Sequence, residues 1–304
     1  MRIHFLLLAG LVIPLSCQRA VVDPGDEPGV LNHVSIGVKD VDLTDISPAT
    51  RTEIEIDGTV KFSWSADDVV GMYPDHGAPA FFEMTGQDGE SVAEFDGGGW
   101  ALKTASEYAV YYPYDYDFRE MEAIPFDYSG QIQVGISNYD HLADYQFMAQ
   151  GMVQPVSGSC NYRMERIEAI AIFKLTIPVP DDYDLFVMRM ADGQRLVYST
   201  SLDISDEFYQ ITPVGDANQF RVQLQGFTTT SENQTLYVYA MIPPQDLSGK
   251  TVILSIQTTE GDVYAAEVDG KNMLNNHAYQ YTATLDCDYQ SLMEKYGIED
   301  GSWE

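Results

Sequence analysis

Short stretches in which apolar and polar residues alternate recur along most of the chain. The clearest pair surrounds Asp57-Gly58, where Ile54 and Ile56 alternate with glutamates and apolar residues again take every second position over 60–64. Asp-Gly favours a two-residue type I′ turn because both central positions need positive φ. The pattern therefore predicts a β-hairpin over residues 52–64.

Comparable runs are separated by Gly, Pro, Asn and Asp along the whole chain. In the first half, strands are expected at 31–38, 69–73, 80–84, 92–95, 100–102 and 108–112, and residues 140–151 have room for one helical turn. In the second half, strands are expected at 167–179, 185–190, 196–198, 220–224, 236–242, 252–257, 263–268 and 279–285. Many short strands between regular turn signals indicate an all-β protein. We expect two tandem β-sandwich domains of the transthyretin-like or Greek-key type.

The division between the domains is expected at 154–161, a polar stretch that precedes the most strand-like run of the chain. This gives an N-terminal domain at 30–156, a C-terminal domain at 157–285 and a tail at 286–304. Within the tail, residues 291–296 favour a short helix that ends at Gly297. Trp303 needs burial, either in its own domain or in a partner.

The first 17 residues read as an export signal. Arg2 precedes an apolar run at 5–15 that is too short to span a bilayer, and Cys17 follows directly after "IPLS". A cysteine in this position indicates a bacterial lipoprotein signal, in which the chain is cut before Cys17 and this residue is acylated. The alternative is an ordinary secretory peptide cut near Ala20. Residues 18–29, rich in Pro, Gly and Asp, should form a flexible tether.

Composition excludes some classes of partner. The formal net charge is −31, from 16 basic and 47 acidic residues. No basic patch can then release counterions, which argues against nucleic acid and anionic membrane surfaces as partners. Cys160 and Cys287 lie in an exported chain, where a disulfide between them and two unpaired thiols are both open alternatives.

Catalytic and metal-binding signatures are missing from the sequence. The histidines after Cys17 are scattered, and no GxSxG, HExxH, P-loop or CxxC pattern is present. Acidic pairs such as Asp67-Asp68 and Asp181-Asp182 do not match calcium-loop spacing and read as solvated turns. The aromatic run at 108–118 reads as a core strand followed by a Tyr-rich turn, although exposed aromatics could also stack on sugar rings. We therefore expect no enzyme activity, cofactor or metal.

Three segments in a fixed order carry a family resemblance. "TRTEIEIDGTVKFSWSADDVVGMYP" at 50–74, "YVYAMIPPQ" at 237–245 and "GKNMLNNHAYQYTATL" at 270–285 resemble the corresponding segments of Bacteroidales fimbrillin-like proteins. The "IPLSC" signal fits the same family. The likeness extends over roughly residues 30 to 285.

The resemblance implies a surface-exposed outer-membrane lipoprotein that forms or joins a fimbria. In structural subunits of this kind, a protease cuts after an N-terminal Arg, the leading strand leaves, and another subunit's C-terminal segment fills the groove. Arg51 is the matching cut, with Thr52 as the new terminus. Residues 31–38 would be the released strand, and 286–304 the donor, with Trp303 as its anchor. Arg51 can equally be a solvated strand residue of an anchor, tip or accessory subunit that keeps its leading strand.

The function expected from the sequence is that of a non-catalytic pilus subunit, structural or accessory, acting in adhesion through strand complementation. Its partners would be other pilin subunits and the outer membrane, with an adhesion ligand that the sequence does not identify. The alternative is a surface glycan-binding lipoprotein of a polysaccharide-uptake system, which would need an exposed aromatic platform. A glycosidase, which needs two carboxylates facing each other across a cleft, is a third possibility.

Overall fold

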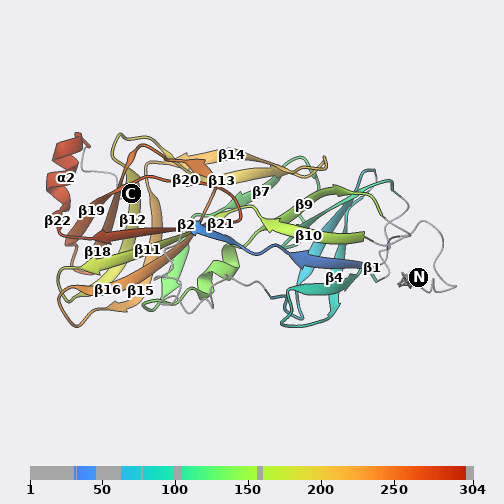
Figure 1. The fold of residues 1–304 in the computed structure, drawn as a ribbon, viewed down its shortest axis with the longest axis horizontal. Coiled ribbons are helices and arrows are strands. Elements are labelled where there is room, and N and C mark those ends of the chain that lie inside the picture. The colour runs from blue at the N-terminus through green and yellow to red at the C-terminus, as the bar shows by residue number, and fades with distance from the viewer. Residues whose placement is uncertain are drawn as a thin grey trace, which may run out of the picture.

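The structure is a computed structural model that describes residues 31, 33–45, 63–76, 78–98, 105–155 and 160–298. It is built almost entirely of strands, which confirms the all-β prediction (Figure 1). The molecule is elongated, with a barrel at one end and a larger body of packed sheets at the other. Most strands expected from alternation are present, often longer by a few residues.

The barrel closes in the order β1-β10-β9-β6-β3-β4-β5. Its strands are β1 (His33–Val38), β3 (Val69–Pro74), β4 (Ala80–Gly86), β5 (Val92–Asp96), β6 (Tyr108–Tyr112), β9 (Met148–Val153) and β10 (Cys160–Arg166). Trp64 fills the centre of this core, fully buried, with edge-to-face contacts to Phe95 at 4.9 Å and Tyr112 at 5.4 Å between ring centroids. The expected hairpin at 52–64 lies mostly outside the described residues.

The second body has two main sheets. One has the order β16-β11-β21-β2 and the other β22-β19-β18-β12-β15-β8. Their strands are β2 (Asp42–Asp45), β8 (Gln131–Val134), β11 (Ala169–Ile177), β12 (Asp182–Met190), β15 (Phe220–Thr228), β16 (Gln234–Ile242), β18 (Thr251–Thr258), β19 (Val263–Asp269), β21 (His277–Thr284) and β22 (Cys287–Asp288). The inner faces share one core, in which the Phe173 and Phe186 rings from opposite sheets lie 4.5 Å apart.

Smaller elements complete the second body. β7 (Ile124–Asp127), β13 (Leu196–Asp203) and β14 (Gln210–Ala217) form a three-stranded sheet, and β17 (Gln245–Asp246) pairs with β20 (Asn272–Met273). A 3₁₀ helix, η1 (Asp140–Tyr145), provides the helical turn expected in this part of the chain. The helix α2 (Tyr289–Tyr296) covers the far end of the molecule (Figure 1).

The stretch at 154–161, where the sequence places the domain division, does not mark a passage between the two bodies. This stretch lies between β9 and β10, which pair with each other in the barrel. Residues 124–145 belong instead to the second body, because β7 pairs with β13 and β8 with β15. The chain thus enters the second body at β2, returns to the barrel, enters again at β7 and η1, and crosses a last time after β10. Composition along the chain does not reveal such crossings.

β8 was missed because its pattern is inverted. Gln131 and Gln133 are buried, whereas Ile132 and Val134 are exposed. The two glutamines occupy the position of a missing neighbour strand beside β16. The Gln131 amide accepts from Met241 N at 2.9 Å and donates to Met241 O at 2.7 Å, and Gln133 accepts from Tyr239 N at 2.8 Å. Side-chain amides therefore satisfy a strand edge that would otherwise leave buried backbone groups unpaired.

The candidate disulfide between Cys160 and Cys287 is not formed. Cys160 is a free, buried thiol at the start of β10 in the barrel core. Cys287 belongs to β22, which pairs with β19 at the opposite end of the molecule (Figure 1). Of the two alternatives left open by the sequence, the free thiol holds for Cys160, because β10 and β22 belong to different bodies.

Two buried ionisable side chains, Arg166 and Glu168, lie where the chain crosses from β10 to β11. Arg166 and Glu168 are both buried, and Glu168 Oε2 accepts from Phe147 N at 3.3 Å. Asn276 N also donates to Glu168 O at 2.9 Å, which ties this crossing to the turn before β21. Burial raises the pKa of Glu168 to about 8, although the nearby Arg166 guanidinium opposes the shift. Burial also lowers the pKa of Arg166.

The glutamine-capped edge gives a stability prediction. Gln131→Ala should lower the free energy of unfolding by about 2–3 kcal/mol, since it leaves buried backbone groups of Met241 without partners. Chemical denaturation measures the change. Gln223→Ala, at an exposed position on the neighbouring strand β15, is the matched control and should change stability by less than about 0.5 kcal/mol. Equal effects of the two substitutions would refute the capping role.

A second prediction concerns pH. The native protein keeps a proton on Glu168 up to about pH 8, whereas the unfolded chain releases it near the ordinary value of 4.5. Unfolding then releases a proton between these limits, so the free energy of unfolding should fall as pH rises from about 5 to 8, by at most about 1.4 kcal/mol per pH unit. Glu168→Gln should remove this component, and Glu294→Gln on the exposed face of α2 should not. Parallel wild-type and Glu168→Gln profiles would disprove the assignment.

Candidate strand-exchange site

The leading strand β1 occupies a slot in the barrel between two strands from distant parts of the chain. It runs parallel to β10, with Val34 opposite Cys160, and antiparallel to β5, with Val34 opposite Phe95. Its alternation places Val34 and Ile36 in the core, both essentially inaccessible to solvent. The indole N–H of Trp64 donates to Ile36 O at 3.1 Å, so the largest core side chain is tied to this strand.

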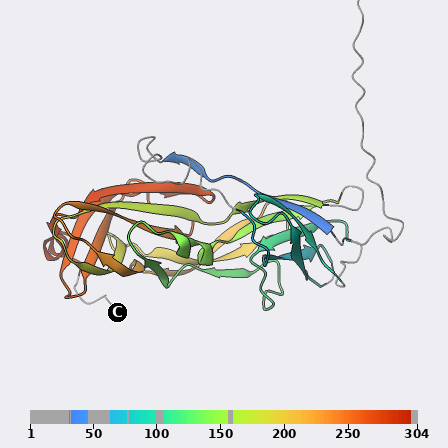
Figure 2. The ribbon, with the colours of Figure 1, turned by 90° about the horizontal axis from the view of Figure 1, so that it is seen from below.

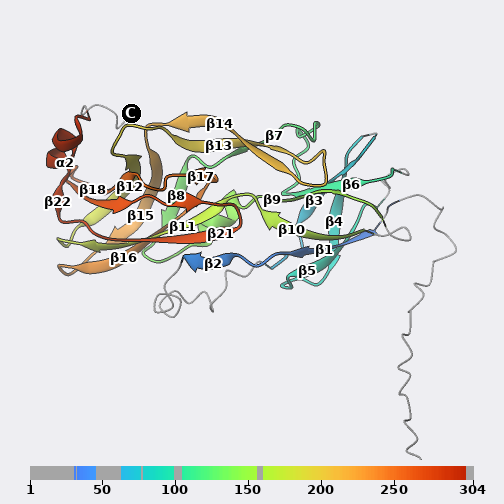
Figure 3. The same ribbon diagram turned by 45° about the horizontal axis from the view of Figure 1, so that its top comes forward.

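The same segment continues into the second body. After Lys39 and Asp40 the chain forms β2, which lies parallel to β21 at the edge of the four-stranded sheet (Figure 3). Asp42 N donates to Asn276 O, and the Asn276 side chain donates to Asp40 O, both at 2.9 Å. Residues 31–45 therefore run lengthwise along the molecule and complete a sheet in each body (Figure 2). Sequence analysis missed β2 because "DLTD" is short and polar.

Burial makes this segment costly to remove. Leu31, Val34, Ile36 and Val41 are all buried, at 5% exposure or less. At about 1.5–3 kcal/mol for each buried apolar side chain, their contribution is about 6–12 kcal/mol as an upper estimate. This is comparable with the whole stability of a typical domain, about 5–15 kcal/mol. The segment should leave only if another strand takes its place.

The C-terminal segment is also held by its own chain. The α2 helix begins at Asp288, whose carboxylate accepts from Gln290 N at 3.3 Å, and ends at Gly297 with φ of 63°, as the sequence predicted. Leu292 and Met293 pack against Ala191, Ile253 and Ala265 on the outer face of the six-stranded sheet. The described part of the candidate donor, 286–298, is therefore a short strand and a helix, not an extended chain.

The buried Arg189 helps to fix α2. Its guanidinium lies 5.8 Å from the centre of the Tyr289 ring, donates to the Met293 sulfur at 3.7 Å and donates to Gln219 Oε1 at 2.7 Å. On the exposed side, Lys295 forms an ion pair with Glu267 at 2.6 Å. These contacts combine apolar, cation–π and charged interactions, so detaching the helix would expose both apolar surface and a buried charge.

Several predicted site residues lie outside the described residues, namely Cys17, Arg51, Thr52 and Trp303. Their roles stay predictions. The Tyr-rich run forms no flat platform of several exposed rings: Tyr108 and Tyr111 are buried in β6, and the exposed Tyr116 ring has the Arg119 guanidinium 3.9 Å from its centre. Asp68, one of the acidic pairs, accepts from Ser65 N at 2.7 Å and from the Tyr112 hydroxyl at 2.8 Å, as expected of a turn residue.

Among the described residues, no group of three or more His, Cys, Asp or Glu side chains is placed to hold a metal ion. No helix within these residues has the length and apolar character needed to cross a bilayer.

Solved structures of other proteins share this fold. A "putative cell adhesion protein" from Bacteroides ovatus matches with a TM-score of 0.54 and 13% identity, over 83% of this chain and 91% of that chain. Another from Bacteroides uniformis matches with a TM-score of 0.50 and 12% identity, over 73% and 88%. The fimbrial anchor protein Mfa2 from Porphyromonas gingivalis aligns more loosely, with a TM-score of 0.37 and 10% identity, over 78% and 81%. No family model and no curated protein matches the sequence.

At these identities, the likeness to the two Bacteroides structures establishes a shared fold. Each of these two is described as a "putative cell adhesion protein", and at the level of the fold they support the fimbrillin-like resemblance of the sequence.

The seat of β1 gives a third prediction. Ile36→Ala should lower the free energy of unfolding by about 2–5 kcal/mol, because it removes a fully buried side chain next to Trp64. Ser35→Ala, on the opposite face of the same strand, is the matched control and should be nearly neutral. Chemical denaturation followed by Trp fluorescence measures both. Equal midpoints for the two variants would show that β1 contributes little to the barrel.

Proposed function

We propose that this protein is a non-catalytic fimbrial subunit of the cell surface, acting in adhesion and assembled by strand complementation. One observation carries the proposal: residues 31–45 complete a sheet in each body and are joined to both by backbone pairing. Loss of this segment would open the edges of β10, β5 and β21 together. In this proposal, the two bodies correspond to the tandem β-sandwich domains of transthyretin-like or Greek-key type expected from the sequence.

The segment is well placed for release by proteolysis. Arg51 follows the end of β2 by six positions, so a cut after it would separate β1 and β2 from everything that follows. Exposed strand edges offer rows of backbone donors and acceptors that another chain can pair with. Because donor and groove are different surfaces, such contacts are head-to-tail and can extend into a fibre.

The acceptor role is the one that the geometry supports best. Acting as an acceptor requires only that β1 and β2 leave. Acting as a donor through residues 286–304 would additionally require α2 to detach from its apolar and charged contacts. We therefore infer that the groove opens more readily than α2 detaches, so that donation of residues 286–304 is the slower step when copies of this chain assemble with one another.

The proposed location is the outer membrane. Acylation of Cys17 would anchor the chain, and residues 18–29 would hold the barrel away from the lipid. The partners are other subunits of the same fibre. No step of this function requires a cofactor or a metal.

Limited trypsin digestion of the chain from residue 18 onward tests the proposal. We expect one early cut after Arg51, with Thr52 as the new N-terminus, followed by species of higher mass on a sizing column. A synthetic peptide of residues 30–46, added in excess, should suppress these species because it refills the groove, and a scrambled peptide should not. Arg51→Gln should stay monomeric under the same digestion.

Two results would contradict this function. One is a clean cut after Arg51 that leaves a stable monomer, which would mean that the opened groove takes no strand from another copy. The same conclusion would be firmer if an added peptide of residues 286–304 also failed to bind the cut protein. Resistance at Arg51 would mean that the leading strand is permanent.

A further inference from the structure

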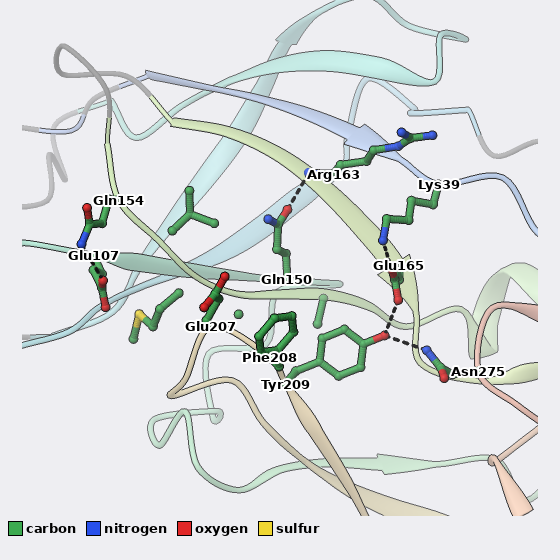
Figure 4. Close-up of a pocket in the computed structure, with 14 residues that line it drawn as sticks. Lys39, Glu107, Gln150, Gln154, Arg163, Glu165, Glu207, Phe208, Tyr209 and Asn275 are labelled. Carbon is green, nitrogen blue, oxygen red and sulfur yellow. Dashed lines mark hydrogen bonds and ion pairs between the residues drawn. The ribbon is translucent and has the colours of Figure 1, made fainter.

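A cleft opens where β9 and β10 diverge in the barrel wall. In the described residues these strands pair only at Glu165 with Ala149 and Arg166 with Met148. Beyond those pairs the strands separate, and the cleft between them encloses about 820 Å³ (Figure 4). We call this space the β9–β10 cleft. Its size lies within the range of small-ligand sites.

An exposed aromatic ring lies at the cleft. Phe208 is 76% exposed, the highest fraction among the exposed large hydrophobic side chains of the described residues. It belongs to the loop between β13 and β14, and Figure 4 places it between Gln150 and Tyr209. A large apolar side chain exposed in this way loses the stabilisation that burial would give it, so its position at a cleft suggests a ligand that covers it.

The loop that carries Phe208 is fixed on both sides. Asp206 O accepts from Met152 N at 2.8 Å, and Gly151 lets the loop approach β9 because any side chain there would collide with Asp206 O and Glu207 O. On the other side, the Tyr209 hydroxyl donates to Glu165 Oε2 at 2.9 Å and accepts from Asn275 Nδ2 at 2.7 Å. The loop on either side of Phe208 is therefore fixed before any ligand binds, which limits the backbone entropy lost on binding.

The cleft mixes hydrogen-bond donors and acceptors around this ring. Gln154 donates to Glu107 Oε1 at 3.0 Å, and Gln150 Oε1 accepts from Arg163 N at 2.6 Å. Each of these side chains has further polar atoms, and the carboxylate of Glu207 and the guanidinium of Arg163 line the same space (Figure 4). A ligand that both donates and accepts at neighbouring positions fits such a set.

Charge and backbone pairing narrow the class of ligand. The lining includes two cations, Lys39 and Arg163, and three carboxylates, Glu107, Glu165 and Glu207, in a chain of net charge −31. This balance disfavours an anionic ligand. An added peptide strand is also disfavoured, because Met152 N and Arg163 N along the two strands already have partners.

We propose that the β9–β10 cleft binds a neutral saccharide unit, with one face of the sugar ring stacked on Phe208. The C–H groups on a sugar face carry slight positive charge and match the negative face of an aromatic ring. The hydroxyl groups, each a donor and an acceptor, match the amides and carboxylates of the lining. Such a ligand would give the proposed adhesive role a target, and in that respect the inference rests on the proposed function.

Ligand-observed saturation-transfer NMR tests the proposal on the chain from residue 18 onward. The probes are maltose, cellobiose, lactose and chitobiose, with 3′-sialyllactose as the anionic probe and the peptide of residues 286–304 as the strand probe. At least one neutral disaccharide should receive saturation. Phe208→Ala should weaken that binding at least tenfold, Phe208→Trp should retain it, and Tyr116→Ala, which removes another exposed aromatic, should leave it unchanged.

The inference is overturned if none of the neutral disaccharides binds, if Phe208→Ala binds as well as the wild type, or if 3′-sialyllactose or the peptide is the ligand that Phe208→Ala loses. Because Phe208 is exposed, its substitution should leave the unfolding midpoint unchanged. Phe208→Ala should also still form species of higher mass after trypsin digestion. A failure of strand exchange and a failure of saccharide binding are therefore told apart by separate measurements.

Discussion

The structure depends on one constraint: two separate bodies are each completed by the same N-terminal segment. β1 closes the barrel between β10 and β5, and β2 extends the sheet of β21, so residues 31–45 supply backbone partners to both. Burial of Val34, Ile36 and their neighbours makes this segment a large part of the barrel's stability. A segment that is structurally essential but lies at the start of the chain is one that a single cut can separate from the rest. This property is the structural basis of the proposed assembly.

Buried polar side chains are the second feature on which this fold depends. In the second body, Gln131 and Gln133 place side-chain amides where a neighbour strand of β16 would lie, and so satisfy backbone groups at its edge. Where the chain passes from the barrel to the sheets, the ionisable side chains of Arg166 and Glu168 are buried. Both arrangements should be sensitive to substitution, because a buried polar group left without a partner destabilises the fold by more than a typical hydrogen bond stabilises it. They specify which groups pair at the edge of β16 and where the chain crosses between the bodies.

The two ends of the chain are treated differently. The leading segment is held by strand pairing that a second strand could reproduce in kind. The trailing segment is held by a helix whose contacts, with Arg189, Met293 and Ile253, have no strand equivalent. A strand that replaced residues 31–45 could restore the same backbone pairing. A strand that replaced α2 could not restore the contacts of the helix. The β9–β10 cleft has none of the α2 contact residues in its lining, but it does include Lys39 of the leading segment.

The all-β class, most strand positions, the helix before Gly297 and the core position of the Tyr-rich strand were predictable from the sequence. These follow from local signals: alternation of period two, turn residues and a C-terminal glycine. Only the tertiary structure decided that β2 is a strand, that 124–145 joins the second body, that Cys160 is unpaired and that Phe208 stands at a cleft. The physical reason is that each of these depends on a partner distant in sequence. β8 shows this most clearly: its inward glutamines look like surface residues until β16 is placed beside them.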